Sequence, residues 1–160
     1  MTNERLFLKQ VIPLYGDCYM SKRENSDESY ILNICDKILK IKGERQRRFD
    51  FLRGDSSPKR PKGTPLPVDI YYEQLQLVIE YREKQHYEDV AFFDHKETIS
   101  NVNRKIQRIL YDKRREEILP LHGIKVIVIP YFELDSKNKR LVRNAEYDEK
   151  VIRNILKDIL

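Results

Sequence analysis

VDIYYEQLQLVIEYREKQHYE, residues 68–88, contains the two segments that decide the fold. The runs VDIYY (68–72) and LVIEYRE (77–83) are both rich in the β-branched and aromatic residues that favour strands. Only EQLQ separates them, so the sequence predicts two strands joined by a tight connection. No Asn-Gly or Asp-Gly pair marks the turn, which leaves its position open.

Glu80 interrupts the second run, where the surrounding residues favour burial. A buried carboxylate is costly unless it is paired or binds a metal. If the connection is centred on Gln74 and Leu75, Asp69 lies directly across from Glu80, with Cβ atoms about 5 Å apart. Two such carboxylates repel each other and favour a divalent cation between them, and oxygen ligands suit Mg2+ or Mn2+. Spacing alone leaves a second interpretation equally open, in which Glu80 lies on an edge strand and faces solvent.

Further polar side chains follow Glu80 along the chain. Arg82 is two residues further on, so in a strand it points to the same face as Glu80. A cation at this place can stabilise charge that develops on a phosphate during hydrolysis, but a guanidinium cannot act as the base. His86 is the candidate for accepting a proton, although lone histidines such as His86, His95 and His122 are more often structural than catalytic.

The flanking segments alternate between helical and strand patterns. The run KVIVIPYF (125–132) is nearly continuous in apolar residues, which is typical of a strand buried on both faces. The resulting order of elements predicts an α/β or α+β sandwich. The expected elements are a short helix within 5–14, a helix from Ser26 to Gly43, a strand over 47–52, an extended loop over 54–67, the two strands above, a helix over 103–123, a strand over 125–132 and a C-terminal helix over about 146–159.

Composition places the chain among small globular proteins. Its 160 residues predict a single domain, 1–160, with a core over about 26–132. Cys18 and Cys35 are too few for a zinc ribbon or a disulfide scaffold, and we expect both to be reduced thiols. The sequence has no apolar run of the roughly 20 residues that a membrane span requires, and MTNERLFLKQ lacks the layout of a signal peptide. We therefore expect a cytoplasmic protein.

Basic residues give the chain a net charge of +5, and a nucleic acid is the commonest partner of such a protein. Positive charge concentrates over 40–60 and again over 104–115, although each cluster alone is typical of a solvated surface. In the second cluster, Asp112 is three residues before Arg115 and four after Arg108, so the three share a helix face. From the residues alone, a surface ion-pair ladder is the simpler explanation of this pattern.

The stretch 68–88, followed by YDKRREEILPLHGIKVIVI (111–129), resembles the very-short-patch-repair-endonuclease-like proteins of the PD-(D/E)XK nuclease superfamily. Those proteins share a VDF strand, a hairpin, an LVIE-x-D-G-x-x-H strand, a YD-x-x-R helix and a final apolar strand. The resemblance covers roughly residues 26–130. It implies a restriction-endonuclease-like fold, in which helices flank a mixed β-sheet on both faces, and Mg2+- or Mn2+-dependent hydrolysis of DNA.

The resemblance also implies roles for individual residues. Asp69 and Glu80 match the metal-binding acids, and Glu28 matches a first-helix glutamate that completes such sites through water. His86 matches the family's histidine and would assist proton transfer or metal binding. The other matching positions are Gln85, Asp112 and Arg115 as supporting residues, and Arg47, Arg48 and Phe49 as a basic and aromatic strand.

The chain departs from the family pattern directly after Glu80. Relatives carry aspartate and glycine where this chain has Arg82 and Glu83, and superfamily members usually carry lysine two residues after the acid. Arg82 is therefore a substitute for that lysine, and the departure concerns the catalytic rate more than the fold.

Three functions follow from these observations. The first is a metal-dependent endonuclease or nickase acting on DNA in repair or restriction, in which Arg47, Arg48, Arg104 and Arg108 contact backbone phosphates. The second is a DNA-binding module of the same fold that has lost catalysis. The third is an interaction protein whose ion pairs only stabilise a surface. The sequence shows no element that reads bases, so specificity would come from a partner protein, and cutting both strands would favour a homodimer.

Overall fold

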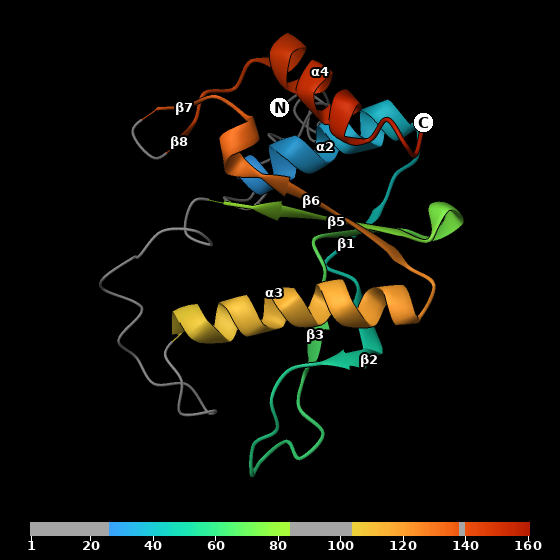
Figure 1. Cartoon of the computed structure of the whole chain (residues 1–160), viewed down its shortest axis with the longest axis vertical. Coiled ribbons are helices and arrows are strands. Elements are labelled where there is room, and N and C mark those ends of the chain that lie inside the picture. Colours follow the sequence, from blue (N-terminus) through green and yellow to red (C-terminus); the bar gives the residue numbers. More distant parts are fainter. Residues whose placement is uncertain (1–25, 84–103, 138–139) are drawn as a thin grey trace, which may run out of the picture.

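A mixed four-stranded sheet with helices on both faces forms the centre of the protein (Figure 1). The structure is a computed structural model that describes residues 26–83, 104–137 and 140–160. Helices α2 and α4 lie on one face of the sheet and α3 lies on the other (Figure 1). The predicted α/β fold, with helices flanking a mixed sheet, is therefore confirmed. The helices are α2 (Asp27–Leu39), α3 (Arg104–Leu121) and α4 (Ala145–Ile155), and the sheet has the order β1 (Glu44–Arg45), β4 (Ile70–Tyr72), β5 (Leu77–Arg82), β6 (Lys125–Pro130).

Strand β5 occupies an interior position, between antiparallel β4 and parallel β6. A single 3-10 turn, η1 (Glu73–Leu75), joins β4 to β5, and Gln76 adopts a left-handed conformation to complete the connection. The register pairs Ile70 with Ile79, so the next residues outward, Asp69 and Glu80, lie opposite each other. The alternative in which Glu80 lies on an edge strand and faces solvent is wrong.

Strand β6 differs from its prediction. It forms an edge of the sheet in the described part of the chain, and only Ile129 among its residues is buried. The expectation of a strand buried on both faces was wrong, because a strand with one neighbour keeps part of its apolar surface accessible. Its side chains still alternate, with Val126 packing on the α3 side and Ile127 and Ile129 packing on the opposite side.

Local chemistry explains where α2 begins and ends. Ser26 caps the helix by accepting a hydrogen bond from the Ser29 N–H (3.1 Å), as the sequence predicts. The helix ends at Leu39 and not at Gly43, because Lys40 takes the left-handed conformation at the C-terminus. Gly43 has another role: a Cβ atom there would collide with the Ile70 side chain, so glycine allows close packing on β4.

Helix α3 follows its predicted range closely. It spans Arg104–Leu121, with Pro120 in its last turn, and Gly123 lies just beyond it with φ +74°. Leu119 near its C-terminal end is fully buried, whereas Ile106 and Ile109 near its start are 45% and 48% exposed. The helix therefore packs on the sheet mainly through its C-terminal half.

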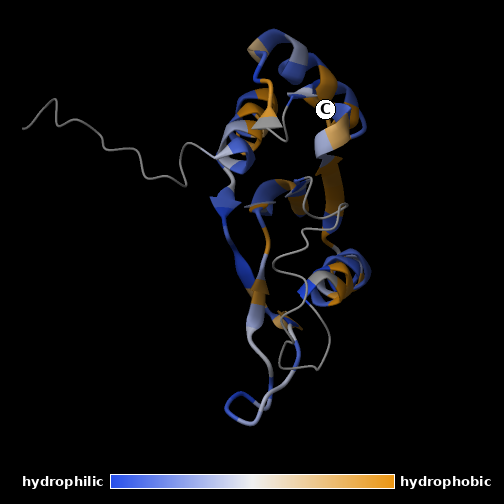
Figure 2. Ribbon diagram, turned by 90° about the vertical axis from the view of Figure 1, so that its left-hand side faces the viewer, coloured by the Kyte–Doolittle hydropathy of each residue, from blue (hydrophilic) through white to orange (hydrophobic). Residues whose placement is uncertain are grey.

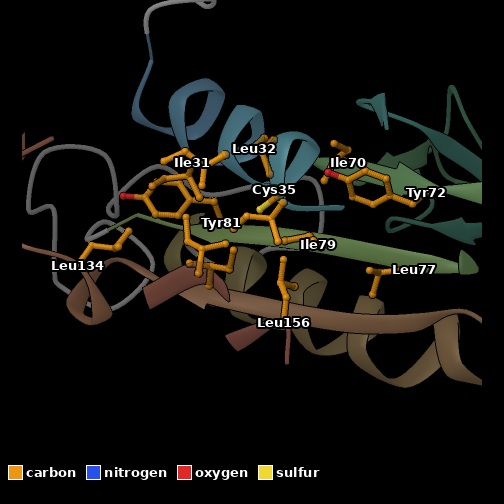
Figure 3. Packing of buried hydrophobic residues seen from close by; sticks show 14 residues of the cluster. Ile31, Leu32, Cys35, Ile70, Tyr72, Leu77, Ile79, Tyr81, Leu134 and Leu156 are labelled. Atoms are coloured by element: carbon orange, nitrogen blue, oxygen red, sulfur yellow. The ribbon is translucent and has the colours of Figure 1, made fainter. Parts of the chain in front are cut away.

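Two apolar clusters stabilise the sheet, one on each face. The larger cluster lies between the sheet, α2 and α4 and includes Leu32, Cys35, Ile79 and Leu156 (Figure 3). The second lies between the sheet, α3 and the outer strands, around Leu119. Full burial of one such aliphatic side chain contributes about 1.5–3 kcal/mol, so the clusters fix the side on which each element packs.

The segment predicted as a strand over 47–52 is β2 (Arg48–Arg53), but it lies outside the main sheet. It pairs antiparallel with β3 (Pro65–Pro67), a strand inside the segment that the sequence predicts to be loop. Together they form a ribbon that extends beside α3 (Figure 1). A second small pair, β7 (Ser136–Lys137) and β8 (Arg140–Leu141), precedes α4. The predicted helix within 5–14 lies outside the described residues.

Candidate functional site

Hydrogen bonds between backbone N–H groups and carboxylates link the segments that carry Asp69 and Glu80. The Asp69 N–H donates to Glu80 Oε1 (3.1 Å), and the Tyr81 N–H donates to Asp69 Oδ2 (2.8 Å). Each carboxylate thus accepts a backbone hydrogen bond from the opposite segment. Glu80 is only 7% exposed, and it points to the α3 face because the neighbouring Ile79 and Tyr81 pack on the other face.

The surroundings of Glu80 disfavour its charged form. Burial is the larger cause and the Asp69 carboxylate is the next, and together they raise the pKa of Glu80 to about 8. The Arg115 guanidinium opposes this shift, as does the hydrogen bond from the Asp69 N–H. A carboxyl group with such a pKa exchanges its proton near neutral pH, which makes it a candidate functional group.

Arg115 connects α3 to both strands of the site. Its Nε donates to the Pro67 carbonyl oxygen (3.0 Å) and lies 3.7 Å from Glu80 Oε2, while Nη1 bonds Asp112 Oδ1 (3.1 Å). Asp112 is itself buried, at 8% exposure. The interpretation of Asp112 and Arg115 as a surface ladder is therefore wrong, since the pair lies against the sheet.

Arg82 points to the same face as Glu80, as the alternation of a strand predicts. Its Nε lies 3.7 Å from Asp112 Oδ2, and its Nη2 forms an ion pair with Glu116. Two carboxylates of α3 thus hold the guanidinium in one orientation. Sequence reasoning missed Glu116, although its position four residues after Asp112 places it on the same helix face.

Glu28 reaches the site through Gln46. The Gln46 side-chain amide donates to Glu28 Oε1 (3.3 Å), and the Gln46 backbone N–H donates to the Asp69 carbonyl oxygen (3.0 Å). Gln46 was also missed, because nothing in the sequence indicates its left-handed backbone, with φ +56°, which lets it contact both residues.

A surface hollow of about 420 Å³ adjoins the site on α3. Asp112 and Arg115 belong both to this hollow and to the ion-pair network around Glu80. Arg104 and Arg108 bring two more cations to it, so the predicted phosphate contacts of α3 share this hollow with Asp112 and Arg115. The lining residues are Arg104, Gln107, Arg108, Tyr111, Asp112 and Arg115.

The other predicted phosphate contacts, Arg47 and Arg48, lie on the strand side. Arg47 is half exposed, pairs with Glu44 (3.0 Å) and lies over the Phe49 ring, 5.6 Å from its centroid. Arg48 donates to the Pro65 carbonyl oxygen and thereby ties β2 to β3.

Several predicted residues lie elsewhere. Gln85, His86, His95 and Cys18 are outside the described residues. His122 stacks on Phe51 with ring centroids 3.6 Å apart, which is a packing role. Within the ranges that the structure describes, no group of three or more histidine, cysteine, aspartate or glutamate side chains is arranged to hold a metal ion. In the same ranges, no helix combines the length and apolar character that crossing a membrane requires.

Comparison with known proteins gives two similarities. No family model matches the chain. Uncharacterized protein 094L of Frog virus 3 (isolate Goorha) is 33% identical over 85 residues, a match that covers 53% of this chain and 52% of the viral protein. Among solved structures, the 5-hydroxymethylcytosine-specific restriction enzyme AbaSI aligns with a TM-score of 0.39 and 19% identity, over 82% of this chain and 40% of the enzyme. At this level of similarity the enzyme's function does not transfer to the chain.

Proposed function

We propose that this protein is a metal-dependent nuclease that hydrolyses phosphodiester bonds of DNA. The observation that carries the proposal is the pair of opposed carboxylates, Asp69 and Glu80, with Glu80 buried in the middle of a sheet. Arg115 lies 3.7 Å from Glu80, yet burial and the Asp69 carboxylate still raise the pKa of Glu80, so the charged pair is unfavourable and a divalent cation would relieve that cost.

The donor atoms fit Mg2+ or Mn2+. Both side chains offer only oxygen, and Mg2+ is commonly bound by one or two carboxylates together with water and substrate phosphate. Asp69 and Glu80 would hold the ion, with Glu28 reaching it through water and His86 contributing as a further ligand or as a proton acceptor. When bound, the ion would supply Lewis acidity toward the phosphate and toward the attacking water.

The chain's own cations would stabilise the substrate. Arg82, oriented by Asp112 and Glu116, would face the charge that develops on the phosphate, in the place where members of the PD-(D/E)XK superfamily usually carry lysine. Arg115 Nε lies 3.7 Å from Glu80 Oε2 and would offset part of the negative charge of the two carboxylates. Gln85 would support His86.

Binding of the DNA backbone would extend from this site over α3. Arg104 and Arg108 line the adjoining hollow and would neutralise phosphates next to the cleaved bond. Arg47 and Arg48 would contact the backbone from the ribbon side. These contacts position DNA without reading its sequence, so we propose that a partner protein or a homodimer supplies specificity.

A DNA-binding module without catalysis is the second candidate. The observation that favours it is the engagement of Arg82 by two carboxylates, since a guanidinium neutralised in this way stabilises a phosphate less than a lysine that is free to approach it. Such a module would bind DNA with strong salt dependence and leave it intact.

Calorimetric titration of Mg2+ and Mn2+, combined with nicking of supercoiled plasmid, tests the proposal. The proteins are the wild type, Asp69→Ala, Glu80→Gln and the control Glu146→Gln, which changes an exposed acid on α4. Metal binding and nicking should both be lost in the first two variants and kept in the control. Metal binding without nicking in the wild type supports the second candidate, and a wild type that binds no metal excludes the carboxylate site.

A further inference from the structure

The ribbon of β2 and β3 ends in a loop that the proposed nuclease site does not use. The loop over 54–64 extends beyond α3, away from the main sheet (Figure 1). Its end is hydrophilic (Figure 2). A projecting polar loop has no role in the apolar core, so its charge and shape require another explanation.

The end of the loop carries only positive charge. Residues 56–63 read SSPKRPKG and contain three basic residues and no acid. Lys59, Arg60 and Lys62 are all exposed. The acid at the base of the loop, Asp55, is paired with Arg114 (3.0 Å), so it does not neutralise the tip.

The loop is held in one shape by its own hydrogen bonds. Gly54 donates to the Thr64 carbonyl oxygen (2.9 Å), and Ser57 and Arg60 exchange two backbone bonds of 3.0 and 2.9 Å. Gly63 has φ +70°, and a Cβ atom there would collide with the Gly54 carbonyl oxygen. Because the loop is already ordered, a ligand that binds it loses little affinity to ordering it.

Helix α3 fixes the base of the ribbon. Arg114 donates to the Arg53 carbonyl oxygen (2.8 Å) and to Asp55, and the Asp55 N–H donates to the Tyr111 hydroxyl (3.1 Å). One residue further along α3, Arg115 contacts Pro67 and Glu80. The ribbon and the carboxylate site are therefore attached to the same turn of the same helix.

We propose that the ribbon tip binds the backbone of duplex DNA along the major groove, at a fixed distance from the Asp69–Glu80 pair. This inference rests on the proposed function, and it specifies that the substrate is double-stranded DNA of the B form. A two-stranded ribbon fits the major groove of B-form DNA, whereas the major groove of duplex RNA is deep and narrow. Arg60 and Asp69 are nine positions apart in the chain, so the tip lies within about 30 Å of the carboxylate pair, less than one helical turn of DNA.

The test is a double variant, Lys59→Gln/Lys62→Gln, which leaves the Arg60 side chain bonded to Thr64 (2.9 Å) and so preserves the loop. Its control is Lys150→Gln/Lys157→Gln, which removes two exposed charges from the opposite side of the molecule. Binding of a duplex of about two helical turns, roughly 20 base pairs, is followed by fluorescence anisotropy over a range of salt concentrations. Circular dichroism verifies that the variants are folded.

The slope of log K against log salt should fall in magnitude by about 1.8 in the tip variant, about 0.9 for each lost phosphate contact, and should be unchanged in the control. Equal changes in both double variants would show an effect of net charge alone and overturn the proposal. An equal loss on duplex RNA would overturn the groove assignment. Metal titration is run on the same samples. A wild type that binds no metal would contradict the proposed nuclease function, whereas the salt-dependence slopes alone decide whether the tip binds DNA.

Discussion

Arg115 lies between two buried acids, with its Nε 3.7 Å from Glu80 Oε2 and its Nη1 3.1 Å from Asp112 Oδ1. Together with the ion pairs of Arg82 with Asp112 and Glu116, it joins helix α3 to strand β5. Removing it would take the guanidinium from beside Glu80 and would leave Asp112 with one fewer cation, since Arg82 Nε still lies 3.7 Å from Asp112 Oδ2. This geometry makes α3 part of the site and not only a covering helix.

Arg115→Gln should therefore destabilise the fold strongly. Loss of one partner from a buried ion pair costs about 3–5 kcal/mol when the remaining charge is left uncompensated, and the Arg82 guanidinium beside Asp112 places Arg115→Gln near the lower end of this range. Lys113→Gln is the matched control, since the pair of Lys113 with Glu117 (3.5 Å) is exposed and its loss should cost about 1 kcal/mol or less. Urea unfolding of the three proteins gives the free energies, and equal losses in both variants would contradict the role of Arg115.

The stability of the metal-free protein should decrease as the pH rises from about 5 to about 8. Burial and Asp69 raise the pKa of Glu80 to about 8, so the folded state holds a proton that the unfolded state releases at much lower pH. The stabilising contribution of this proton is complete below the unfolded pKa and is lost as the pH rises through the folded pKa. Unfolding curves at several pH values should show this decrease in the wild type, and Glu80→Gln should remove it.

Binding of Mg2+ or Mn2+ should release a proton near neutral pH. The ion requires the charged form of Glu80, which burial disfavours, so affinity should increase as the pH rises toward 8. Calorimetry in two buffers with different ionisation enthalpies measures the number of protons released. A binding enthalpy that is identical in both buffers at pH 7 would mean that Glu80 is already ionised in the metal-free protein.

Arg82→Ala should reduce nicking without weakening metal binding. Removing a group that stabilises transition-state charge typically lowers the rate by about a hundredfold or more. Arg82→Lys keeps a positive charge two residues after Glu80 and should retain most of the activity. The measurement is nicking at saturating metal, with the metal affinity of each variant determined separately; a loss of metal affinity in Arg82→Ala would instead assign the residue to the metal site.

Much of the site could be predicted because its residues are close in sequence. Asp69 and Glu80 are joined by one tight turn, so strand periodicity predicted them to lie opposite each other if the connection is centred on Gln74 and Leu75, and the observed register meets that condition. Arg82 followed from the same alternation. The interior position of β5 could not be derived from spacing, because it depends on the parallel pairing with β6, which lies more than 40 residues further along the chain.

The partners of these residues could not be predicted for a related reason. Glu116 and Gln46 contact the site through the packing of α3 and through a left-handed backbone residue, and neither leaves a distinctive pattern in the sequence. The same holds for the ribbon, since β3 consists of Pro65–Pro67 and prolines argue against a strand. At the edge of a small ribbon they are tolerated, because few ladder hydrogen bonds are needed there.

The turn between β4 and β5 fixes more than the path of the chain. Asp69 and Glu80 are eleven positions apart in the sequence. The length of η1 places the two residues opposite each other across the strand pair. Insertion of a single residue that shifts the pairing by one position would turn one carboxylate to the opposite face of the sheet, which α2 and α4 cover. The number of residues in this turn is thus as strict a signature of the site as the two acids, and homologous chains that keep the chemistry should keep the count.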